Sequence, residues 1–271
     1  MVAPSLPTCY LAHGGGPLPL IGEPSNARLV PHWVRIGEEF PHPKAVLIVS
    51  AHWEEELPTI QLNPKPELEF DYYGFPSETY EYKYPVLPAL EVGERVGQLL
   101  TQAGIEHAKS TTKNFDHGVF VPMMKMYPSA NIPILQVSLQ TSLDVEAHIR
   151  LGAALSPLRS EGVLLLASGF SFHNLPGIMG GLPRQHVAIW SKGFNDWLKD
   201  VCTNSGYDRE SRLEMLRGWR NAPYAAECHP REEHLIPLMV AAGAAMDDCG
   251  ALIYNDEAFM GSVAVSSYRF G

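Results

Sequence analysis

The sequence predicts a single α/β domain, residues 1–271, built on a central mixed, largely parallel sheet flanked by helices. Short apolar runs rich in β-branched residues alternate along the chain with segments of helical apolar spacing, which is the pattern of strands joined by crossover helices. The 23 glycines and 23 prolines are dispersed as turn residues and never gather into a linker, so no domain boundary is indicated. With 45% hydrophobic residues, a chain of this length can bury a sizeable core.

Each predicted strand is an apolar run that stops at turn residues. The run at 45–51 is the clearest buried strand, because it is continuous and rich in valine and isoleucine. The run at 163–167 is of the same kind and stops before Ser168 and Gly169. The remaining predicted strands cover residues 8–12, 59–62, 132–139, 251–254 and 262–269.

The predicted helices combine apolar periodicity with suitable end residues. Residues 142–162 predict one helix of about 20 residues, because Asp144 and Glu146 lie in a first turn where the helix dipole favours acids and Gly162 can end the helix. The other predicted helices cover residues 88–103, 123–127, 186–203, 211–217 and 232–245, with an irregular aromatic segment at 70–84 and a loop at 114–118.

Charge and composition exclude several classes of function. The chain has 20 Lys+Arg against 30 Asp+Glu, so its formal charge of −10 does not favour nucleic acid or anionic membranes as partners. No apolar run approaches the roughly 18 residues of a membrane helix, and the first residues lack the basic and apolar regions of a leader. The four cysteines are far apart and form no CxxC pair. We therefore expect a cytoplasmic protein with reduced thiols, present as a monomer or a small homo-oligomer.

Three histidines follow predicted strands closely. His13 comes directly after the run at 8–12, His52 directly after that at 45–51, and His173 a few residues after that at 163–167. Ligands and reactive groups of an open α/β sheet collect beyond the carboxyl ends of its strands. We therefore expect these three side chains to meet at one edge of the sheet.

Converging histidines predict a metal centre. Neutral imidazole binds iron, zinc, copper and nickel, and three protein ligands leave positions free for substrate. His13 precedes three glycines, whose missing side chains let the backbone turn sharply. Further donors are His229, Glu233 and His234, and Pro230 suits the entry to a helix whose first turn would present the last two. Any one of these histidines, taken alone, is more often a structural or surface residue than a functional one.

Other motif interpretations lack essential parts. The His13-to-Gly16 run is similar to the oxyanion-hole sequence of esterases, but no G-x-S-x-G nucleophile motif occurs. The glycines are followed by neither G-K-[ST] nor a completed G-x-G-x-x-G, so nucleotide binding is not indicated. HExxH is absent as well, which removes the zinc protease interpretation.

Six short motifs together resemble one family in order and spacing, from about residue 11 to the closing strands. They are Leu11-Ala12-His13-Gly14-Gly15-Gly16-Pro17, Ser50-Ala51-His52-Trp53, Tyr73-Gly74-Phe75-Pro76, Phe115-Asp116-His117-Gly118, Ala167-Ser168-Gly169 with His173-Asn174-Leu175, and Glu233-His234. The family is that of the class III extradiol ring-cleavage dioxygenases, of the protocatechuate 4,5-dioxygenase β-subunit type, and within it the DOPA dioxygenase branch. Each motif is weak alone, whereas six in sequence are specific.

The resemblance implies a mononuclear non-heme metal held by His13, His52 and His234. It implies His173 as the acid/base residue and His117 as a residue lining the pocket. Fe(II) is the cofactor expected for activity, and Zn(II) is a second occupant of such sites.

Two departures bear on these assignments. Many relatives have a serine where this chain has Gly15. Outside the DOPA branch a carboxylate is the third ligand, which makes Glu233 a rival to His234.

The activity that the resemblance implies is insertion of O2 into a catechol, DOPA-like or related, with extradiol cleavage of the ring. Tyr72, Tyr73 and Phe75 could supply a face for the aromatic substrate, or form a packed aromatic loop instead. Two alternatives use the same histidines: a zinc-dependent hydrolase, and a non-enzymatic metal- or ligand-binding protein of the same fold.

Overall fold

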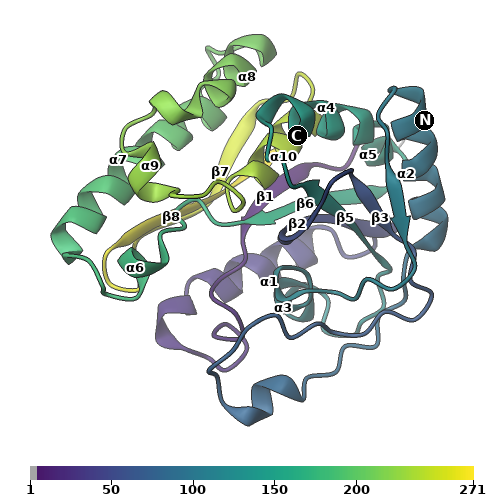
Figure 1. Cartoon of the computed structure of the whole chain (residues 1–271), viewed down its shortest axis with the longest axis horizontal. Helices are drawn as coiled ribbons and strands as arrows, with labels where there is room; N and C mark the ends of the chain where they lie inside the picture. Colours follow the sequence, from purple (N-terminus) through teal and green to yellow (C-terminus); the bar gives the residue numbers. More distant parts are fainter. Residues whose placement is uncertain (1–4) are drawn as a thin grey trace.

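The computed structural model describes residues 5–271, within which eight strands form one sheet; residues 1–4, at the start of the predicted domain, lie outside the described residues. The strands are β1 (Thr8–Ala12), β2 (Ala45–Glu55), β3 (Thr59–Gln61), β4 (Ala108–Ser110), β5 (Ile134–Gln140), β6 (Val163–Gly169), β7 (Gly250–Phe259) and β8 (Val263–Phe270). Their order across the sheet is β4-β3-β5-β2-β6-β1-β8-β7 (Figure 1).

The centre of the sheet is parallel and its margins are mixed, as predicted. Strands β5, β2, β6 and β1 run parallel to one another, while β8 pairs antiparallel with both β1 and β7. Ser168 of β6 lies in register with Leu11 of β1 and with Ser50 of β2. These three residues therefore lie at one level of the sheet, where β1 and β6 are close to their ends and β2 continues to Glu55.

Helices cover both faces of the sheet (Figure 1). The helices are α1 (Leu29–Glu39), α2 (Leu90–Gln102), α3 (His117–Met126), α4 (Val145–Leu155), α5 (Pro157–Ser160), α6 (Leu175–Ile178), α7 (Arg184–Thr203), α8 (Arg209–Arg217), α9 (Ala225–Cys228) and α10 (Ile236–Ala244), with short 3-10 turns η1 (Pro24–Asn26), η2 (Ser77–Tyr80) and η3 (Trp219–Asn221). Helices α1 and α3 pack together on one face, and α10 with α2, α4 and α7 covers the other. No helix within residues 5–271 combines the length and the apolar character needed to cross a bilayer.

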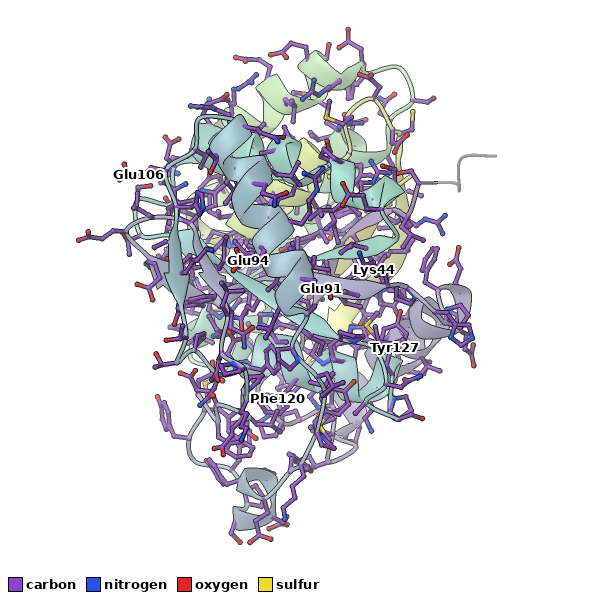
Figure 2. The ribbon with its side chains drawn as sticks, turned by 90° about the vertical axis from the view of Figure 1, so that its right-hand side faces the viewer. Lys44, Glu91, Glu94, Glu106, Phe120 and Tyr127 are labelled. Carbon is purple, nitrogen blue, oxygen red and sulfur yellow. The ribbon has the colours of Figure 1, made fainter. Side chains whose placement is uncertain are left out.

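Helix α2 illustrates how the core forms. Val96 and Leu100 of this helix are fully buried against the sheet. Glu91 and Glu94 lie on its outer face, which Figure 2 shows toward the viewer. Full burial of one such aliphatic side chain stabilises the fold by roughly 1.5–3 kcal/mol relative to exposure.

Two predicted boundaries were wrong in ways that matter for the site. Strand β2 continues past residue 51 to Glu55, so His52 lies inside the strand. The register of β2 against β5 shifts between Val49 and Glu54, and such a bulge re-aims the side chains within it. Helix α3 begins at His117, whereas the sequence predicted a loop there and a helix only from residue 123.

Three further differences concern helices. The predicted helix 142–162 is divided into α4 and α5 at Pro157, because proline has no N–H to continue the hydrogen-bond ladder. Helix α10 begins at Ile236, so Glu233 and His234 precede it and do not lie in its first turn. Helix α1 was not predicted at all.

Candidate metal centre

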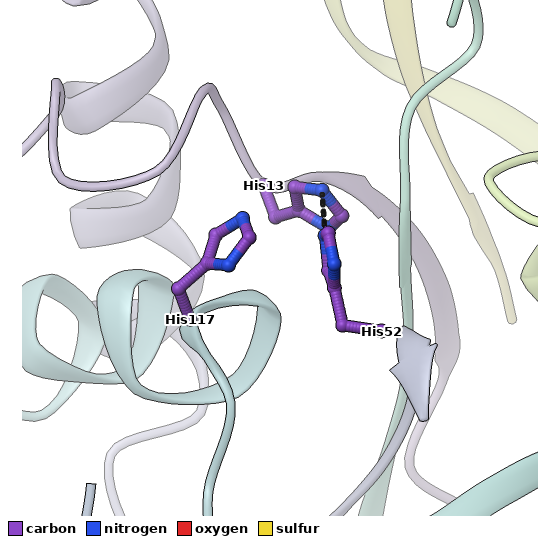
Figure 3. Close-up of side chains that lie close together, drawn as sticks. All are labelled: His13, His52 and His117. Carbon is purple, nitrogen blue, oxygen red and sulfur yellow. Dashed lines mark hydrogen bonds between the residues drawn. The ribbon is translucent and has the colours of Figure 1, made fainter. Parts of the chain in front are cut away.

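Three imidazoles converge beyond the central strands. The Nε2 atom of His52 lies 3.2 Å from Nε2 of His13 and 3.3 Å from Nε2 of His234. The centroids of the His13 and His234 rings are 5.1 Å apart. The predicted approach of His13 to His52 at this edge is confirmed, and Figure 3 shows it. His173, the third histidine expected at this edge, stacks on the ring of His234.

His13 is positioned by the end of β1 and by the glycine turn that follows it. Its backbone N–H donates to the carbonyl of Gly169, which continues the pairing of β1 with β6. Gly14 and Gly16 then adopt φ values of +80° and +54°, a region that residues with a Cβ rarely occupy. The chain can therefore turn away at once and leave the imidazole buried at the strand end.

His234 is positioned by its own carbonyl group. This oxygen accepts hydrogen bonds from the backbone N–H of Phe170, at 3.0 Å, and from the hydroxyl of Tyr10, at 2.9 Å. A Cβ atom added to Gly169 would lie 2.2 Å from the same oxygen. Glycine at the end of β6 thus lets the segment before α10 come close enough to present His234.

The outer nitrogens of the three rings face oxygen atoms. Nδ1 of His13 lies 2.9 Å from Oγ of Ser168, and Nδ1 of His234 lies 2.9 Å from Oε1 of Glu233. Nδ1 of His52 lies 3.4 Å from Oδ2 of Asp71. Protons on Nδ1 leave the lone pair of each Nε2 directed inward, which is the arrangement seen around histidine-bound metals.

Burial favours the ligand form of these rings. Desolvation, reinforced by neighbouring histidines, holds the pKa of His13, His52 and His234 well below the usual value of 6.5. For His52 the nearby carboxylate of Asp71 opposes this shift without reversing it. Neutral imidazoles with inward Nε2 atoms are the donor set that a divalent transition metal requires, so the residues present fit such an ion.

His117 is the fourth imidazole of the cluster. It lies at the first residue of α3, and its ring centroid is 4.0 Å from that of His52. His13, His52 and His117 each offer a nitrogen within 4.8 Å of the others, so this set is a second possible metal triad. Nδ1 of His117 lies 2.8 Å from Oδ1 of Asp71, which makes it the donor and leaves Nε2 free.

His173 and Glu233 lie on the other side of His234. The rings of His173 and His234 are stacked, with centroids 3.4 Å apart and planes 17° apart. Nδ1 of His173 lies 2.9 Å from Oε1 of Glu233, the same oxygen that faces Nδ1 of His234. Burial raises the pKa of Glu233, but the hydrogen bond and the charge of His173 outweigh it and lower the pKa below its usual value.

His229, a candidate ligand from sequence, has a structural role in the described chain. It is buried, and its Nε2 lies 3.1 Å from the carbonyl oxygen of Ser171. The preceding carbonyl, of Cys228, accepts a hydrogen bond from the backbone N–H of His173 at 2.9 Å. His229 therefore supports the segment that carries His173 and lies outside the cluster of inward nitrogens.

The three aromatic residues proposed from sequence have different surroundings. Tyr72 is buried, its ring centroid is 5.8 Å from that of His117, and its hydroxyl donates to the carbonyl of Thr79. The Phe75 ring packs against the glycine turn and against Tyr72. The side chain of Tyr73 is 92% exposed. The structure thus places Tyr72 beside His117, packs Phe75 against Tyr72 and the glycine turn, and turns Tyr73 toward solvent.

Two residues that contact the imidazoles were not identified as functional from sequence. Ser168 stands within one of the quoted motifs, but nothing local connects it with His13, 155 residues earlier. Asp71 directly precedes the aromatic residues and touches His117, 46 residues later. A carboxylate before an aromatic run is too common to serve as a signal.

Comparisons with known proteins show which family this chain resembles. A sequence profile described as “Catalytic LigB subunit of aromatic ring-opening dioxygenase” matches residues 7–271. The chain is 34% identical over 266 residues to the “4,5-DOPA dioxygenase extradiol” of Beta vulgaris, covering 97% of this chain and 96% of that protein. It is 35% identical over 284 residues to “Dioxygenase tasH” of Hapsidospora irregularis, covering 98% and 85% respectively. The crystal structure of an uncharacterized protein from Escherichia coli K12 superposes with a TM-score of 0.76 at 26% identity, covering 98% of this chain and 100% of that one.

Proposed function

The chain belongs to the family of catalytic LigB subunits of aromatic ring-opening dioxygenases, and we propose that it cleaves a catechol such as DOPA in the extradiol manner at a mononuclear non-heme metal. The proposed ligands are His13, His52 and His234. The observation that carries this proposal is the convergence of their Nε2 atoms while each Nδ1 faces an oxygen atom. The family match does not favour a zinc hydrolase or a non-enzymatic binding protein.

Fe(II) is the proposed metal. When bound, it would supply the redox chemistry that lets O2 react with a catechol, whereas zinc is redox-inert. Glu233 is proposed as a supporting residue and not as the third ligand, because its Oε1 faces the Nδ1 side of both His173 and His234.

His173 is proposed as the acid/base residue. Glu233 accepts from Nδ1, which leaves Nε2 as the atom that takes a proton from a catechol hydroxyl and later returns one to the product. A positioned acid/base group of this kind typically contributes about a hundredfold to ten-thousandfold in rate. His117, held in the same way by Asp71, presents Nε2 as an acceptor for a substrate hydroxyl. Tyr72 and Phe75 are proposed as apolar walls for the ring.

Anaerobic reconstitution with Fe(II), followed by O2 uptake with a panel of catechols and detection of a yellow ring-opened product, tests the function. We expect His13→Ala, His52→Ala and His234→Ala to lose both metal and turnover. His173→Ala should retain metal and lose at least about a hundredfold in turnover. His186→Ala, an exposed position at the start of α7, is the matched control and should behave like wild type.

Near-normal turnover of His173→Ala would show that its assigned role is wrong. The third ligand is tested separately by comparing His234→Ala with Glu233→Gln. If the glutamine variant loses metal while the alanine variant keeps it, the carboxylate and not the imidazole is the ligand. Absence of O2 uptake with every catechol by the Fe(II)-loaded protein would overturn the proposed activity.

A further inference from the structure

The carboxylate of Asp71 lies between two imidazoles of the cluster. Its Oδ1 accepts from the backbone N–H of His117 at 2.9 Å and faces the Nδ1 of the same residue at 2.8 Å. Its Oδ2 is 3.4 Å from Nδ1 of His52. Among the described residues, these two histidines are its only ion-pair partners within 4 Å. One side chain from the loop between β3 and η2 therefore contacts both rings.

This contact fixes where the ring protons lie. An ionised carboxylate has acceptor sites only, so an imidazole nitrogen that faces it must carry the hydrogen. Oδ1 of Asp71 already accepts from both N–H groups of His117, so the carboxylate acts as an acceptor at this position. With its proton on Nδ1, which faces this acceptor, His52 would have its lone pair on Nε2, the atom near both His13 and His234.

We propose that Asp71 is a positioning residue that selects the metal-binding tautomer of His52 and holds His117 in the matching orientation. This inference rests on the proposed metal site and adds a residue to it. Glu233 has the corresponding place on the other side, since its Oε1 faces Nδ1 of both His173 and His234. Each carboxylate thus holds one proposed ligand and one histidine proposed to meet the substrate.

Replacement of Asp71 by asparagine should change the tautomer of His52, which a purely structural role of Asp71 would not predict. The two N–H groups of His117 require an acceptor, so the carbonyl oxygen of the new amide must take the place of Oδ1. The amide NH2 group then faces Nδ1 of His52 and can only donate. His52 would have to accept on Nδ1 and carry its proton on Nε2, where it blocks metal coordination.

Although asparagine is the more conservative replacement, it should weaken metal binding at least as much as alanine does. In Zn(II) competition titrations with a chromophoric chelator, Asp71→Asn should weaken metal affinity by about 10- to 100-fold, the usual effect of losing an outer partner of a ligand. Asp71→Ala should be no worse than Asp71→Asn, because it leaves His52 free to choose its tautomer. The matched control is Glu69→Gln in the same loop, whose carboxylate pairs with Lys113 at 2.7 Å and should leave affinity unchanged.

Nitrogen-15 NMR of the imidazoles provides a readout that does not depend on activity. In the metal-free wild type we expect His52 and His117 both to be protonated on Nδ1. In metal-free Asp71→Asn, His52 should shift to protonation on Nε2 while His117 keeps its tautomer. The wild-type spectrum tests the inference even if a variant fails to fold.

The outcomes separate this inference from the proposed function. A wild-type protein that binds neither Zn(II) nor Fe(II) overturns the metal site itself. A wild type that binds metal, together with an Asp71→Asn variant of equal affinity, overturns the role of Asp71 alone. The role of Asp71 is also overturned if Asp71→Asn binds metal clearly more tightly than Asp71→Ala, or if His52 of the wild type is protonated on Nε2.

Discussion

Replacement of Ser168 by alanine should weaken metal binding through His13. Ser168 lies near the end of β6, and its hydroxyl is buried. The hydroxyl donates to the carbonyl of Gly118, so its oxygen is left to accept from Nδ1 of His13 at 2.9 Å. Alanine removes both partners at once and leaves a buried N–H and a buried carbonyl without hydrogen bonds.

The magnitude follows from these two groups. A buried polar group left without a partner costs about 1–3 kcal/mol, so the loss of two partners in Ser168→Ala should lower the free energy of unfolding of the metal-free protein by about 2–6 kcal/mol. The freed imidazole can also carry its proton on Nε2, which should reduce metal affinity by about 10- to 100-fold.

Urea unfolding in the presence of EDTA measures the first effect, and Zn(II) competition measures the second. Ser138→Ala is the matched control. Ser138 is also buried in a strand, accepts from the backbone N–H of Thr59 at 2.9 Å and donates to the carbonyl of Leu57 at 3.4 Å. It contacts no histidine of the cluster, so its loss should reduce stability without changing metal affinity.

Unchanged Zn(II) affinity of a folded Ser168→Ala variant would refute the reasoning, because the tautomer of His13 would then not depend on the serine. An equal loss of affinity in Ser168→Ala and Ser138→Ala would refute it as well, since general destabilisation would account for both.

Three further predictions concern stability. Burial lowers the pKa of His32 to about 4, whereas the same side chain in the unfolded protein titrates near 6.5. The neutral form of His32 therefore stabilises the folded state fully above pH 6.5, and about 3 kcal/mol of the free energy of unfolding is lost as the pH falls toward 4. His32→Phe, which keeps the stacking on Tyr254, should therefore lose less stability between pH 7 and 4.5 in urea unfolding; a loss equal to that of wild type would contradict this. Gly152→Ala should lower the free energy of unfolding by about 3 kcal/mol, because the added Cβ would lie 2.0 Å from the carbonyl oxygen of Val240 in α10. The control Gly206→Ala, at an exposed position, should change it little, and equal urea midpoints for the two variants would count against the packing argument. Chelation of a metal present at a thousandfold excess over its Kd should remove about 4 kcal/mol and lower Tm by on the order of 10 °C, and a Tm indifferent to EDTA would mean that no such ion binds the folded state.

The sequence by itself determined the architecture and the approach of His13 to His52. Continuous apolar runs such as 45–51 and 163–167 place apolar side chains on both faces of a strand, and a half-exposed sheet would leave one face in water. These runs therefore require a central sheet that is covered on both faces. That requirement, together with parallel strands, brings His13 and His52 to one edge, as the structure confirms. Local patterns were sufficient for the end of β1 before His13, whereas β2 continues past His52 to Glu55.

Tertiary structure decided what surrounds these histidines. Which of His229 and His234 lies beside His52 depended on how the segment before α10 crosses the end of β6, where Gly169 admits the carbonyl of His234. The pairing of Asp71 with His52 and His117 depended on the course of an irregular loop that has no periodic pattern. Hydrogen bonds between residues far apart in the chain are set by the packing of whole elements, so no local signal in the sequence could have placed those partners.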